Sequence, residues 1–365
     1  MKILLVVGSF PPMLCGVGDY TRSLARALTT IPGVHVAVLT SAEAEGGGRA
    51  GEPFEVFPAV RRWELSEIAA VRRVIREWQP DVIHVQYPSR GYSGPLSWLL
   101  PMLLLAERPP VVQTWHEYVP GARTALWHLA IGVAPGDVVV VRPEFRERMP
   151  WWYRALTGRR EFHLVPNAPT LPRVELSDAE RAEIRGRYAP PDRRLLAYFG
   201  FLYANKGIDD LLGIVDPERH HLVVVGELQR ADPFQVALAE RIARPPLAGH
   251  VTLAGFLEAP EAARVLAAVD AVVLPFRDGG GEWNTSLKAA AAQGTFVLTT
   301  STRRSGYVAA QHVYYARPGD RGELRAALDR HVGSRIASPA PELAGPSWGE
   351  IARAHVAIYE RRIGR

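Results

Sequence analysis

Short apolar runs alternate with amphipathic stretches along the chain, which is the pattern of a parallel sheet with helices between its strands. The run KILLVVG (2–8) is apolar apart from Lys2 and ends at a glycine, which predicts a buried strand. The stretch DYTRSLARALTTI (19–31) carries apolar residues at helical spacing, and Asp19 is the expected cap of that helix. We expect a second helix over 65–78 and further strands over 34–40, 81–88, 110–118, 137–143 and 161–167.

The segment 168–194 interrupts this alternation, because it holds four prolines and many charges and has no strand pattern. We expect the link between two domains there. The alternation then restarts, with strands expected over 195–200, 221–227, 250–256, 271–276, 295–300 and 312–316. The pattern predicts an α/β protein with two similar doubly wound domains, over 1–170 and 190–345, followed by a last helix over 347–363.

Composition narrows the classes of protein that fit. The 365 residues carry a net charge of +5 in scattered arginines, which suits an anionic lipid or a phosphorylated ligand as well as a plain solvated surface. No nucleic-acid motif accompanies the charge, so no nucleic-acid partner is expected. Cys15 is the only cysteine, which favours a reducing, cytoplasmic compartment. The apolar stretch 94–106 is interrupted by Pro101 and is shorter than the roughly 20 residues of a membrane span.

Two loops of the first half could carry chemistry, because ligands of open parallel sheets bind at the carboxyl ends of strands. Gly16 and Gly18 would let the backbone approach a ligand closely, although an ordinary flexible loop explains them equally well. His116 follows a strand in QTWHEY and could orient a sugar hydroxyl or exchange a proton with it; a structural histidine is the alternative. The 11 histidines and one cysteine show no metal-ligand spacing, so no metal is expected.

Two loops of the second half point to phosphate. In YFGFLYANKG (198–207) a strand ends at Gly200, and Lys206 stands at the start of the next helix, where its charge adds to the helix dipole. In PFRDGGGEWNTSLKAAAAQG (275–294) three glycines precede small hydroxyl residues at a helix start, which is a seat for an anion. The plain alternatives are a solvated lysine and a loose glycine tip.

The order of these parts resembles the GT-B fold, and more narrowly family 4 of the retaining, nucleotide-sugar-dependent glycosyltransferases. The segments that carry the resemblance are PPMLCGVGDYTRSLARAL, TWHEY, VPNAP, FGFLYANKGIDDLL, VVVGE, VTLAGFL, VDAVVLPFRDGGGEWNTSLKAAAAQGTFVLTT and SWGEIARAHVAIYE. The resemblance implies two Rossmann-like domains that face each other across a cleft, with the acceptor on the N-terminal domain and the donor on the C-terminal one. It also implies that the helix within 347–365 crosses back to the N-terminal domain.

The resemblance assigns roles residue by residue. His116 and Lys206 match the histidine that touches the transferred sugar and the lysine that binds phosphate. The donor-binding positions are Gly16, Gly18, Gly200, Asn205, Gly226, Glu227, Phe256, Leu257, Glu282, Asn284, Thr285 and Ser286. Asp19, Tyr20 and Glu117 fall on the acceptor side.

Two positions depart from the family pattern. Phe201 stands where the family usually has an arginine, and Ala289 aligns with a glutamate that would hold the ribose. These departures leave open a protein that binds sugar nucleotides without transferring them, and an epimerase or hydrolase on the same fold is a further alternative.

The expected reaction is a retaining transfer by a front-face mechanism, with no metal or other cofactor, from a nucleoside-diphosphate sugar to a hydroxyl acceptor. The departing phosphate would take the acceptor proton, which needs no carboxylate pair. The stretch RPEFRERMPWWYRALTGRR (142–160) sets aromatic residues among arginines, which suits a lipid-linked acceptor and peripheral contact with the inner membrane face. Ordinary helix packing is the alternative.

Overall fold

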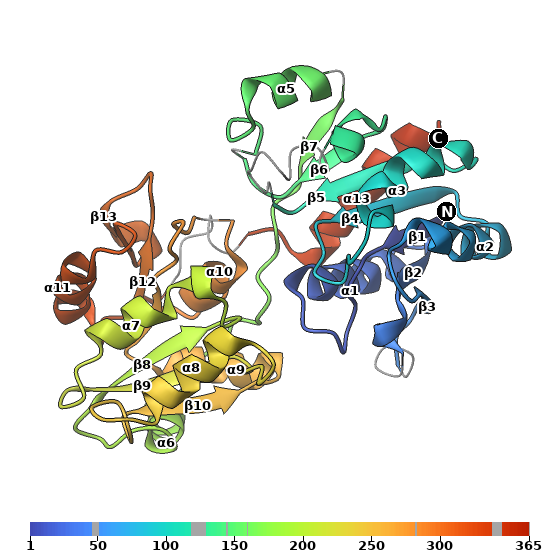
Figure 1. Ribbon diagram of the computed structural model, residues 1–365. Helices are drawn as coiled ribbons and strands as arrows, with labels where there is room; N and C mark the ends of the chain where they lie inside the picture. Colours follow the sequence, from blue (N-terminus) through green and yellow to red (C-terminus); the bar gives the residue numbers. More distant parts are fainter. Residues whose placement is uncertain are drawn as a thin grey trace. The chain divides into compact units, whose positions relative to one another are not determined.

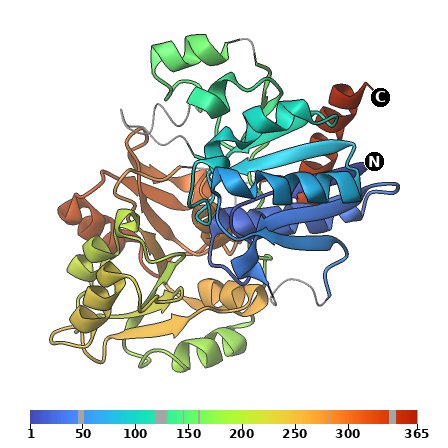
Figure 2. The same cartoon turned by 45° about the vertical axis from the view of Figure 1, so that its right-hand side comes forward.

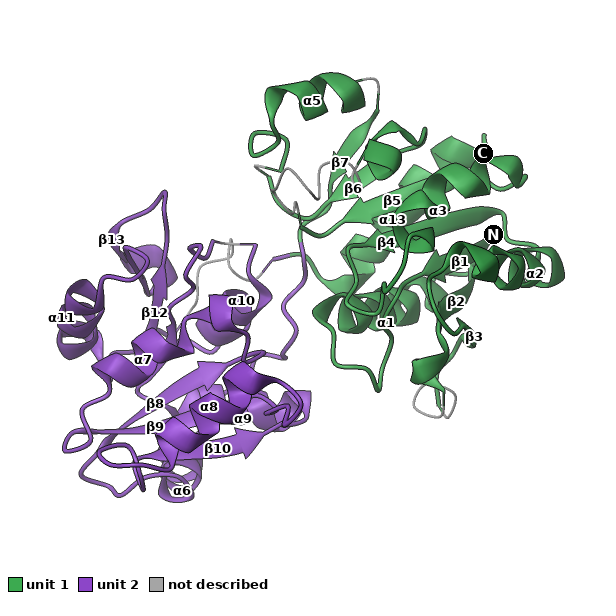
Figure 3. Ribbon diagram, viewed as in Figure 1, with its two compact units in different colours: residues 1–166, 346–365 green, residues 167–345 purple. Residues whose placement is uncertain are grey.

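The computed structural model describes residues 1–45, 51–117, 129–143, 145–158, 160–281, 283–337 and 345–364. The chain divides into two compact units of similar size (Figure 3). Unit 1 comprises residues 1–166 together with 346–365, and unit 2 comprises residues 167–345. The C-terminal segment therefore returns to the unit in which the chain began, as the family resemblance implies.

Unit 1 is built on a seven-stranded parallel sheet with the strand order β3-β2-β1-β4-β5-β6-β7 (Figure 1). Its central strands are fully buried, because helices cover both faces of a parallel sheet. The strands are β1 (Lys2–Val6), β2 (His35–Ser41), β3 (Glu55–Val60), β4 (Val82–Tyr87), β5 (Val111–Trp115), β6 (Val138–Val140) and β7 (Phe162–Leu164).

The sequence pattern predicts every strand of this sheet except β3. That strand contains Pro58, which has no backbone N–H to give to a sheet and reads as a strand breaker. The structure tolerates it because β3 lies at the edge of the sheet, paired on one side only with β2.

The helices of unit 1 include one that arrives from the far end of the sequence. Helix α13 (Trp348–Ile363) begins at Ser347, which forms a reciprocal capping box with Glu350, and it packs against α1 (Gly16–Thr29) (Figures 1 and 2). Further helices and 3-10 turns of unit 1 among the described residues include η1 (Ala42–Ala44), η2 (Leu65–Glu67), α2 (Ile68–Trp78), α3 (Leu96–Leu103), η3 (Leu104–Ala106) and α5 (Trp151–Thr157).

Unit 2 repeats the same architecture with the strand order β10-β9-β8-β11-β12-β14-β13. All pairs are parallel except β13 with β14, an antiparallel edge pair that the sequence pattern did not predict. The strands are β8 (Arg194–Phe199), β9 (His220–Val225), β10 (Val251–Gly255), β11 (Ala271–Leu274), β12 (Val297–Thr300), β13 (Gly306–Val308) and β14 (Val313–Ala316). The prediction of two doubly wound α/β units is confirmed.

The segment 168–194, predicted as the link between domains, is instead part of unit 2. It forms α6 (Asp178–Gly186), which is capped by a Ser177–Glu180 capping box and packs against α9 (Ala259–Ala268). Ile184 is fully buried in the core of unit 2. The prolines and charges flank or cover this helix, so composition alone pointed to a linker where a single apolar face is enough to dock the segment.

The other helices of unit 2 form two packed groups. Helices α7 and α11 contact each other, whereas α9 contacts α6 and α10. The bounds are η4 (Ala204–Lys206), α7 (Ile208–Ile214), α8 (Pro233–Ile242), α10 (Thr285–Ala291), η5 (Ala309–Gln311) and α11 (Arg321–His331). Because β8 is followed by β9 on one side and β11 lies on the other, the crossover direction reverses beside β8.

The apolar stretch 94–106 becomes α3 and η3, with Pro101 inside α3 and with Leu96 and Leu100 buried. Within the described ranges, no helix combines the length and the apolar character that a bilayer crossing would require.

Gly207 lies in the loop after β8, where the backbone packs closely against a neighbouring segment. Its φ is +72°, and a Cβ there would lie 1.8 Å from the carbonyl oxygen of Pro275. Gly249 also has a positive φ, of +81°, but nothing lies within 4 Å of its Cβ position. We expect Gly249→Ala to lower the free energy of unfolding by about 1 kcal/mol. Gly207→Ala should cost more than about 3 kcal/mol, because the backbone must also move. Urea unfolding checks both, and equal losses would contradict the close approach.

Candidate active site

The loops that follow β8 and β11 flank the point in unit 2 where the strand order reverses. Open parallel sheets bind ligands in the crevice at such a point, beyond the carboxyl ends of the strands. Residues 200–206 follow β8 and residues 275–284 follow β11. Both phosphate-binding candidates of the sequence therefore lie on one edge of one sheet.

Two glycines bring the strand ends of unit 2 close together. Gly200 has φ +136°, and a Cβ on it would lie 3.1 Å from the Oγ of Ser286. A Cβ on Gly226 would lie 2.2 Å from the carbonyl oxygen of Gly200. Side chains at these positions would push the segments apart, so glycine is needed for Gly200, Gly226 and Ser286 to be neighbours.

Lys206 is half-buried at the end of η4, in the loop that begins at Gly200. The loop that carries it is tied to the loop after β11, because the backbone N–H of Arg277 donates to the carbonyl oxygen of Asn205 over 3.0 Å. The ammonium nitrogen lies 5.4 Å from the ring centre of Phe276, a cation–π distance. The charge of Lys206 is thereby kept near the edge of the sheet. The Asn205 side chain is exposed, and its backbone carbonyl makes the contact.

The start of α10 differs in detail from the predicted anion seat. Asn284 is the N-cap, and its side-chain oxygen accepts from the backbone N–H of Leu287 over 3.1 Å, so this amide oxygen is already used in holding the helix. In the part of the chain that the structure describes, no acceptor is recorded for the backbone N–H groups of Thr285 and Ser286. Glu282 lies outside the described residues.

The predicted donor-binding positions Gly226, Glu227, Phe256 and Leu257 follow β9 and β10 on the same edge. Glu227 is exposed, and Phe256 keeps 64% of its surface accessible, which leaves a large ring free at the edge. Leu257 packs partly against the core of unit 2 and supports the loop. The backbone N–H of Gly226 donates to the carbonyl oxygen of Gly255 over 2.9 Å, which keeps the two strand ends paired.

Phe201, the departure from the family arginine, stacks on Tyr203 with ring centres 5.5 Å apart and an interplanar angle of 13°. The buried hydroxyl of Tyr198 donates to the carbonyl oxygen of Phe201 over 2.8 Å. An aromatic pair therefore occupies the place of the arginine. Ala289, the other departure, is fully buried in α10 and offers no group to a ribose.

In unit 1, His116 directly follows β5 and is 7% exposed. Its Nε2 lies 2.8 Å from Oε1 of Gln86, and its backbone N–H donates to the carbonyl oxygen of Tyr87 over 2.8 Å. The ring of Tyr20 meets the imidazole edge to face, with centres 4.7 Å apart. Burial first, and then the nearby charges of His355 and Arg142, lower the pKa of His116 to about 3. The imidazole is therefore neutral at physiological pH.

The glycine loop of the first half is shorter than predicted, because α1 begins at Gly16 and not near Asp19. Cys15 is the N-cap position, so the prediction of Asp19 as the cap was wrong; Asp19 lies in the first turn. A Cβ on Gly18 would lie 2.7 Å from the carbonyl oxygen of Ser9, so helix packing already requires a glycine there. Gly16 is exposed at the helix start.

Two acidic residues on the predicted acceptor side differ in environment. The Asp19 side chain is exposed by surface area, yet the protein around it raises its pKa to about 6 by desolvation, against the opposing charge of Arg22. Glu117 is exposed and lies 3.5 Å from Arg142, which makes a weak surface ion pair.

A trio of side chains in the described residues has a spacing that could hold a metal ion, namely Asp137, Glu161 and His163, whose ligand atoms all lie within 4.8 Å of one another. Asp137 and Glu161 precede β6 and β7. The trio thus lies at the amino ends of these strands, on the edge of the sheet opposite to His116. Arg361 lies 3.4 Å from Glu161 and supplies a competing positive charge.

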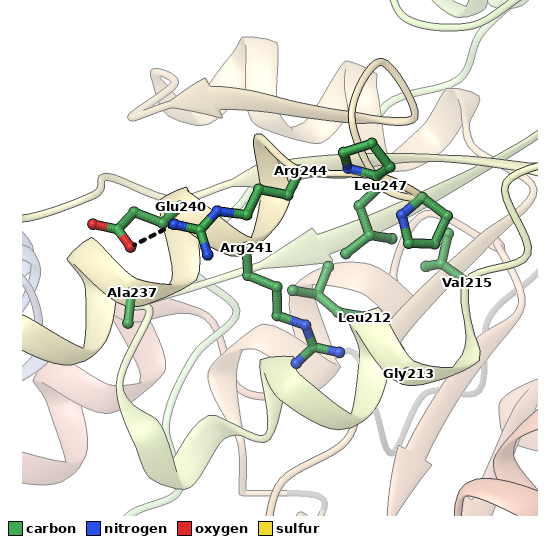
Figure 4. A pocket seen from close by; sticks show the side chains of 10 residues that line it. Leu212, Gly213, Val215, Ala237, Glu240, Arg241, Arg244 and Leu247 are labelled. Carbon is green, nitrogen blue, oxygen red and sulfur yellow. Dashed lines mark hydrogen bonds and ion pairs between the residues drawn. The ribbon is translucent and has the colours of Figure 1, made fainter.

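Unit 2 also has a hollow of about 560 Å³ between the ends of α7 and α8, shown in Figure 4. Its two arginines are already paired, Arg241 with Asp209 at 3.5 Å and Arg244 with Glu240 at 3.4 Å. Helix carboxyl ends border it, and their carbonyl groups disfavour an anion. The hollow is therefore a poor phosphate site, and it lies away from the carboxyl ends of the strands.

Comparison with known proteins agrees with this geometry. The family model described as "Glycosyltransferase Family 4" matches residues 15–194, and the one described as "Glycosyl transferases group 1" matches residues 193–333. Together these matches span both sheets. The chain belongs to the GT-B glycosyltransferases.

Individual relatives of this glycosyltransferase are distant in sequence. A GDP-mannose-dependent alpha-mannosyltransferase of Mycobacterium tuberculosis (strain CDC 1551 / Oshkosh) is 22% identical over 302 residues, which are 72% of this chain and 73% of the relative. Among solved structures, a glycosyltransferase from Rickettsia africae ESF-5 superposes with a TM-score of 0.70 at 14% identity, covering 100% of this chain and 98% of the other. Anabaena HepE, in complex with UDP and glucose, gives a TM-score of 0.68 at 16% identity, covering 100% and 98%. The structural likenesses show the fold.

The structure shows buried polar residues beside the candidate site residues that the sequence pattern did not single out. Gln86 and His84 lie inside β4 and are fully buried, and the Tyr359 hydroxyl of α13 contacts His84. Lys288 is only 3% exposed in α10, and its ammonium group donates to the carbonyl oxygen of Asn167 over 2.9 Å. The one available signal was the presence of polar residues inside otherwise apolar runs.

The buried histidines predict how unit 1 responds to acid. The pKa of His116 is about 3 and that of His355 about 4, both lowered by burial from 6.5, and that of His84 is also lowered. Below pH 6.5 these residues take up protons in the unfolded state but not in the folded state, so stability is full above pH 6.5 and falls toward pH 4. The loss should reach about 2 kcal/mol for each such histidine at pH 5.

Urea unfolding followed by tryptophan fluorescence measures this loss, since eight of the nine tryptophans belong to unit 1. We expect His355→Leu to flatten the dependence between pH 7.5 and 5, and the exposed His35→Asn to leave it unchanged. A His355→Leu protein with the wild-type pH dependence would contradict the assignment.

Proposed function

We propose that the protein transfers a sugar from a nucleoside-diphosphate sugar to a hydroxyl acceptor, with retention of the anomeric configuration and without a bound metal. The observation that carries the proposal is the close approach of Gly200, Gly226 and Ser286 at the edge of the unit 2 sheet where the loop that carries Lys206 also lies. The mycobacterial relative is named for GDP-mannose and HepE was solved with UDP and glucose, so sugar nucleotides are the substrate class to test. Their different nucleosides leave the base open.

The chemistry requires charge compensation more than a protein nucleophile. The bond between the sugar C1 and the diphosphate oxygen breaks, and a bond from C1 to the acceptor oxygen forms on the same face. The acceptor proton passes to an oxygen of the departing diphosphate. Lys206 and the backbone N–H groups of Thr285 and Ser286 would stabilise the charge that develops on that leaving group.

His116 would serve the sugar and not the phosphate. Its neutral imidazole cannot supply a positive charge, but one ring nitrogen can accept a hydrogen bond from a sugar hydroxyl. Tyr20, packed between His116 and Trp348 of α13, would hold the ring in place. Asp19, at the start of α1, would face the acceptor side.

The test is an assay of nucleoside diphosphate release and of the glycoside product. We expect Lys206→Ala to lower kcat by about 100- to 1,000-fold with an unchanged circular dichroism spectrum, because one charge-assisted contact to the leaving group is lost. Arg244→Ala, which also removes one surface charge of unit 2, should leave kcat unchanged. Activity of the wild type should persist in EDTA. Full activity of Lys206→Ala would contradict the role of the ammonium group.

A second candidate function is binding of sugar nucleotides without transfer, which Phe201 and Ala289 favour because neither can make the polar contacts of the family residues. The same assay separates the two. A transferase releases nucleoside diphosphate when acceptor is present and forms the glycoside, an inert binder releases none, and an epimerase changes the sugar without transferring it.

The acceptor side of the proposal is a lipid-linked hydroxyl compound reached by peripheral contact with an anionic membrane. Trp151 at the start of α5 is 76% exposed, whereas the neighbouring Tyr153 is buried. Arg146, Arg148 and Arg154, which are close to it in the sequence, are exposed. An exposed indole among arginines suits the boundary between lipid headgroups and acyl chains.

Co-sedimentation with phosphatidylcholine vesicles that contain roughly 30% phosphatidylglycerol tests this contact. Trp151→Ala should reduce the bound fraction of protein about tenfold, since a large apolar side chain is lost from the contact. Leu65→Ala removes an exposed apolar residue of η2 and should have no effect. Equal binding by wild type and Trp151→Ala, or no binding by either, would refute the membrane contact.

A further inference from the structure

A chain of buried hydrogen bonds runs behind His116 through the unit 1 sheet. Its first link joins Nε2 of His116 to Oε1 of Gln86 over 2.8 Å. The amide nitrogen of Gln86 then lies 3.3 Å from Nε2 of His84, and that nitrogen also lies 2.7 Å from Oγ1 of Thr114. Gln86, His84 and Thr114 are completely buried, so water does not compete for these bonds.

The hydrogen-bond chain ends at a residue of the C-terminal helix, α13. Nδ1 of His84 is 2.5 Å from the hydroxyl of Tyr359, which is fully buried in α13. The ring of His355, one turn earlier in α13, lies 5.4 Å from that of His84. Residues 84 and 359 are thus far apart in the sequence but in contact in the structure. Helix α13 packs against His84 through these two side chains.

The amide group of Gln86 determines which atoms donate and which accept along this hydrogen-bond chain. Its oxygen can only accept and its nitrogen can only donate. With the oxygen toward His116, the hydrogen of His116 must be on Nε2; with the nitrogen toward His84, Nε2 of His84 must be unprotonated. His84 then carries its hydrogen on Nδ1 and donates to Tyr359. The single lone pair on Nε2 of His84 is shared by two donors, the Thr114 hydroxyl at 2.7 Å and the more distant Gln86 amide at 3.3 Å.

The opposite nitrogen of His116 is left open. In the described part of the chain no partner is recorded for Nδ1 of His116, in contrast to Nε2. A ring nitrogen without hydrogen is an acceptor. Burial keeps the ring from taking a second proton, because the pKa of His116 is lowered to about 3.

We infer that Gln86 is a positioning residue, which holds His116 in the Nε2–H tautomer so that Nδ1 accepts a hydrogen bond from a hydroxyl of the transferred sugar. The inference rests on the proposed function for the identity of the ligand, but the tautomer follows from the chain itself. Tyr20 supports the same geometry, because its ring packs edge to face on the imidazole at 4.7 Å and limits its tilt. His116 acts in this account as an acceptor of one hydrogen bond, and it stays uncharged.

Three variants separate positioning from general stability. Gln86→Met keeps the approximate size but removes the acceptor for His116. Gln86→Glu keeps an acceptor, and His84 can adjust by moving its hydrogen to Nε2 and accepting from the Tyr359 hydroxyl at Nδ1. Gln113→Met is the matched control, because Gln113 is also completely buried, on neighbouring β5, and bonds Nε1 of Trp115 at 3.0 Å outside the chain.

The first measurement is the tautomer of His116 by ¹⁵N–¹H correlation of histidine-labelled protein at pH 7, with His116→Gln to assign the signal. We expect the Nε2–H pattern in the wild type, in Gln86→Glu and in Gln113→Met, and a loss of that pattern in Gln86→Met. An Nδ1–H signal in the wild type, or an unchanged signal in Gln86→Met, would overturn the inference.

The second measurement is steady-state kinetics of the same proteins. We expect Gln86→Met to lower kcat/KM for the donor about tenfold, the loss of one neutral hydrogen bond, with the KM of the acceptor unchanged. Gln113→Met should show no loss, and Gln86→Glu should recover activity relative to Gln86→Met. Equal kinetics for Gln86→Met and Gln113→Met would refute the positioning role. If the wild-type protein shows the Nε2–H tautomer of His116 but transfers no sugar, the proposed function is refuted, whereas the role of Gln86 in setting the tautomer is not.

Discussion

A departing diphosphate carries negative charge that has to be compensated where it forms, and the arrangement of unit 2 is understandable as a response to this constraint. Parallel strands end together on one edge, so the loops after β8, β9 and β11 meet there. Glycines at 200 and 226 remove the side chains that would keep these loops apart. In the proposed function, Lys206 would supply charge to a site built mainly from backbone, where Phe201 stands in place of a second cation.

Unit 1 solves a different problem with the same type of sheet. A sugar is neutral, so it needs hydrogen bonds of defined direction and gains little from a charge. His116 is buried and neutral, as the proposed contact with a sugar requires, and in our inference Gln86, His84 and Tyr359 would fix its orientation through the hydrogen bonds behind it. The return of α13 to unit 1 matters for this inference, because Tyr359 of α13 is the last residue of the hydrogen-bond chain. In our inference that chain determines which ring nitrogen of His116 can accept a hydrogen bond.

Sequence periodicity was sufficient to predict the parts of the fold that depend on burial alone. It failed for segments and residues whose structure or role depends on contacts with distant parts of the chain. The central strands and the location of Lys206 after β8 followed from apolar runs. Strand β3 was missed because Pro58 is tolerated only at a sheet edge, and α6 because its charges suggested a linker. The positioning role inferred for Gln86 could not be predicted from the sequence, because it depends on a hydrogen-bond chain that ends at Tyr359, a residue more than 250 positions away. The roles of the individual site residues remain predictions.

A crystal structure of the full chain with a bound nucleoside diphosphate tests the central claim most directly. The account predicts phosphate oxygens within hydrogen-bond distance of the Lys206 ammonium group and of the backbone N–H groups of Thr285 and Ser286. A diphosphate bound elsewhere, for example in the hollow between α7 and α8, with the Lys206 side chain turned away from it, would contradict the account.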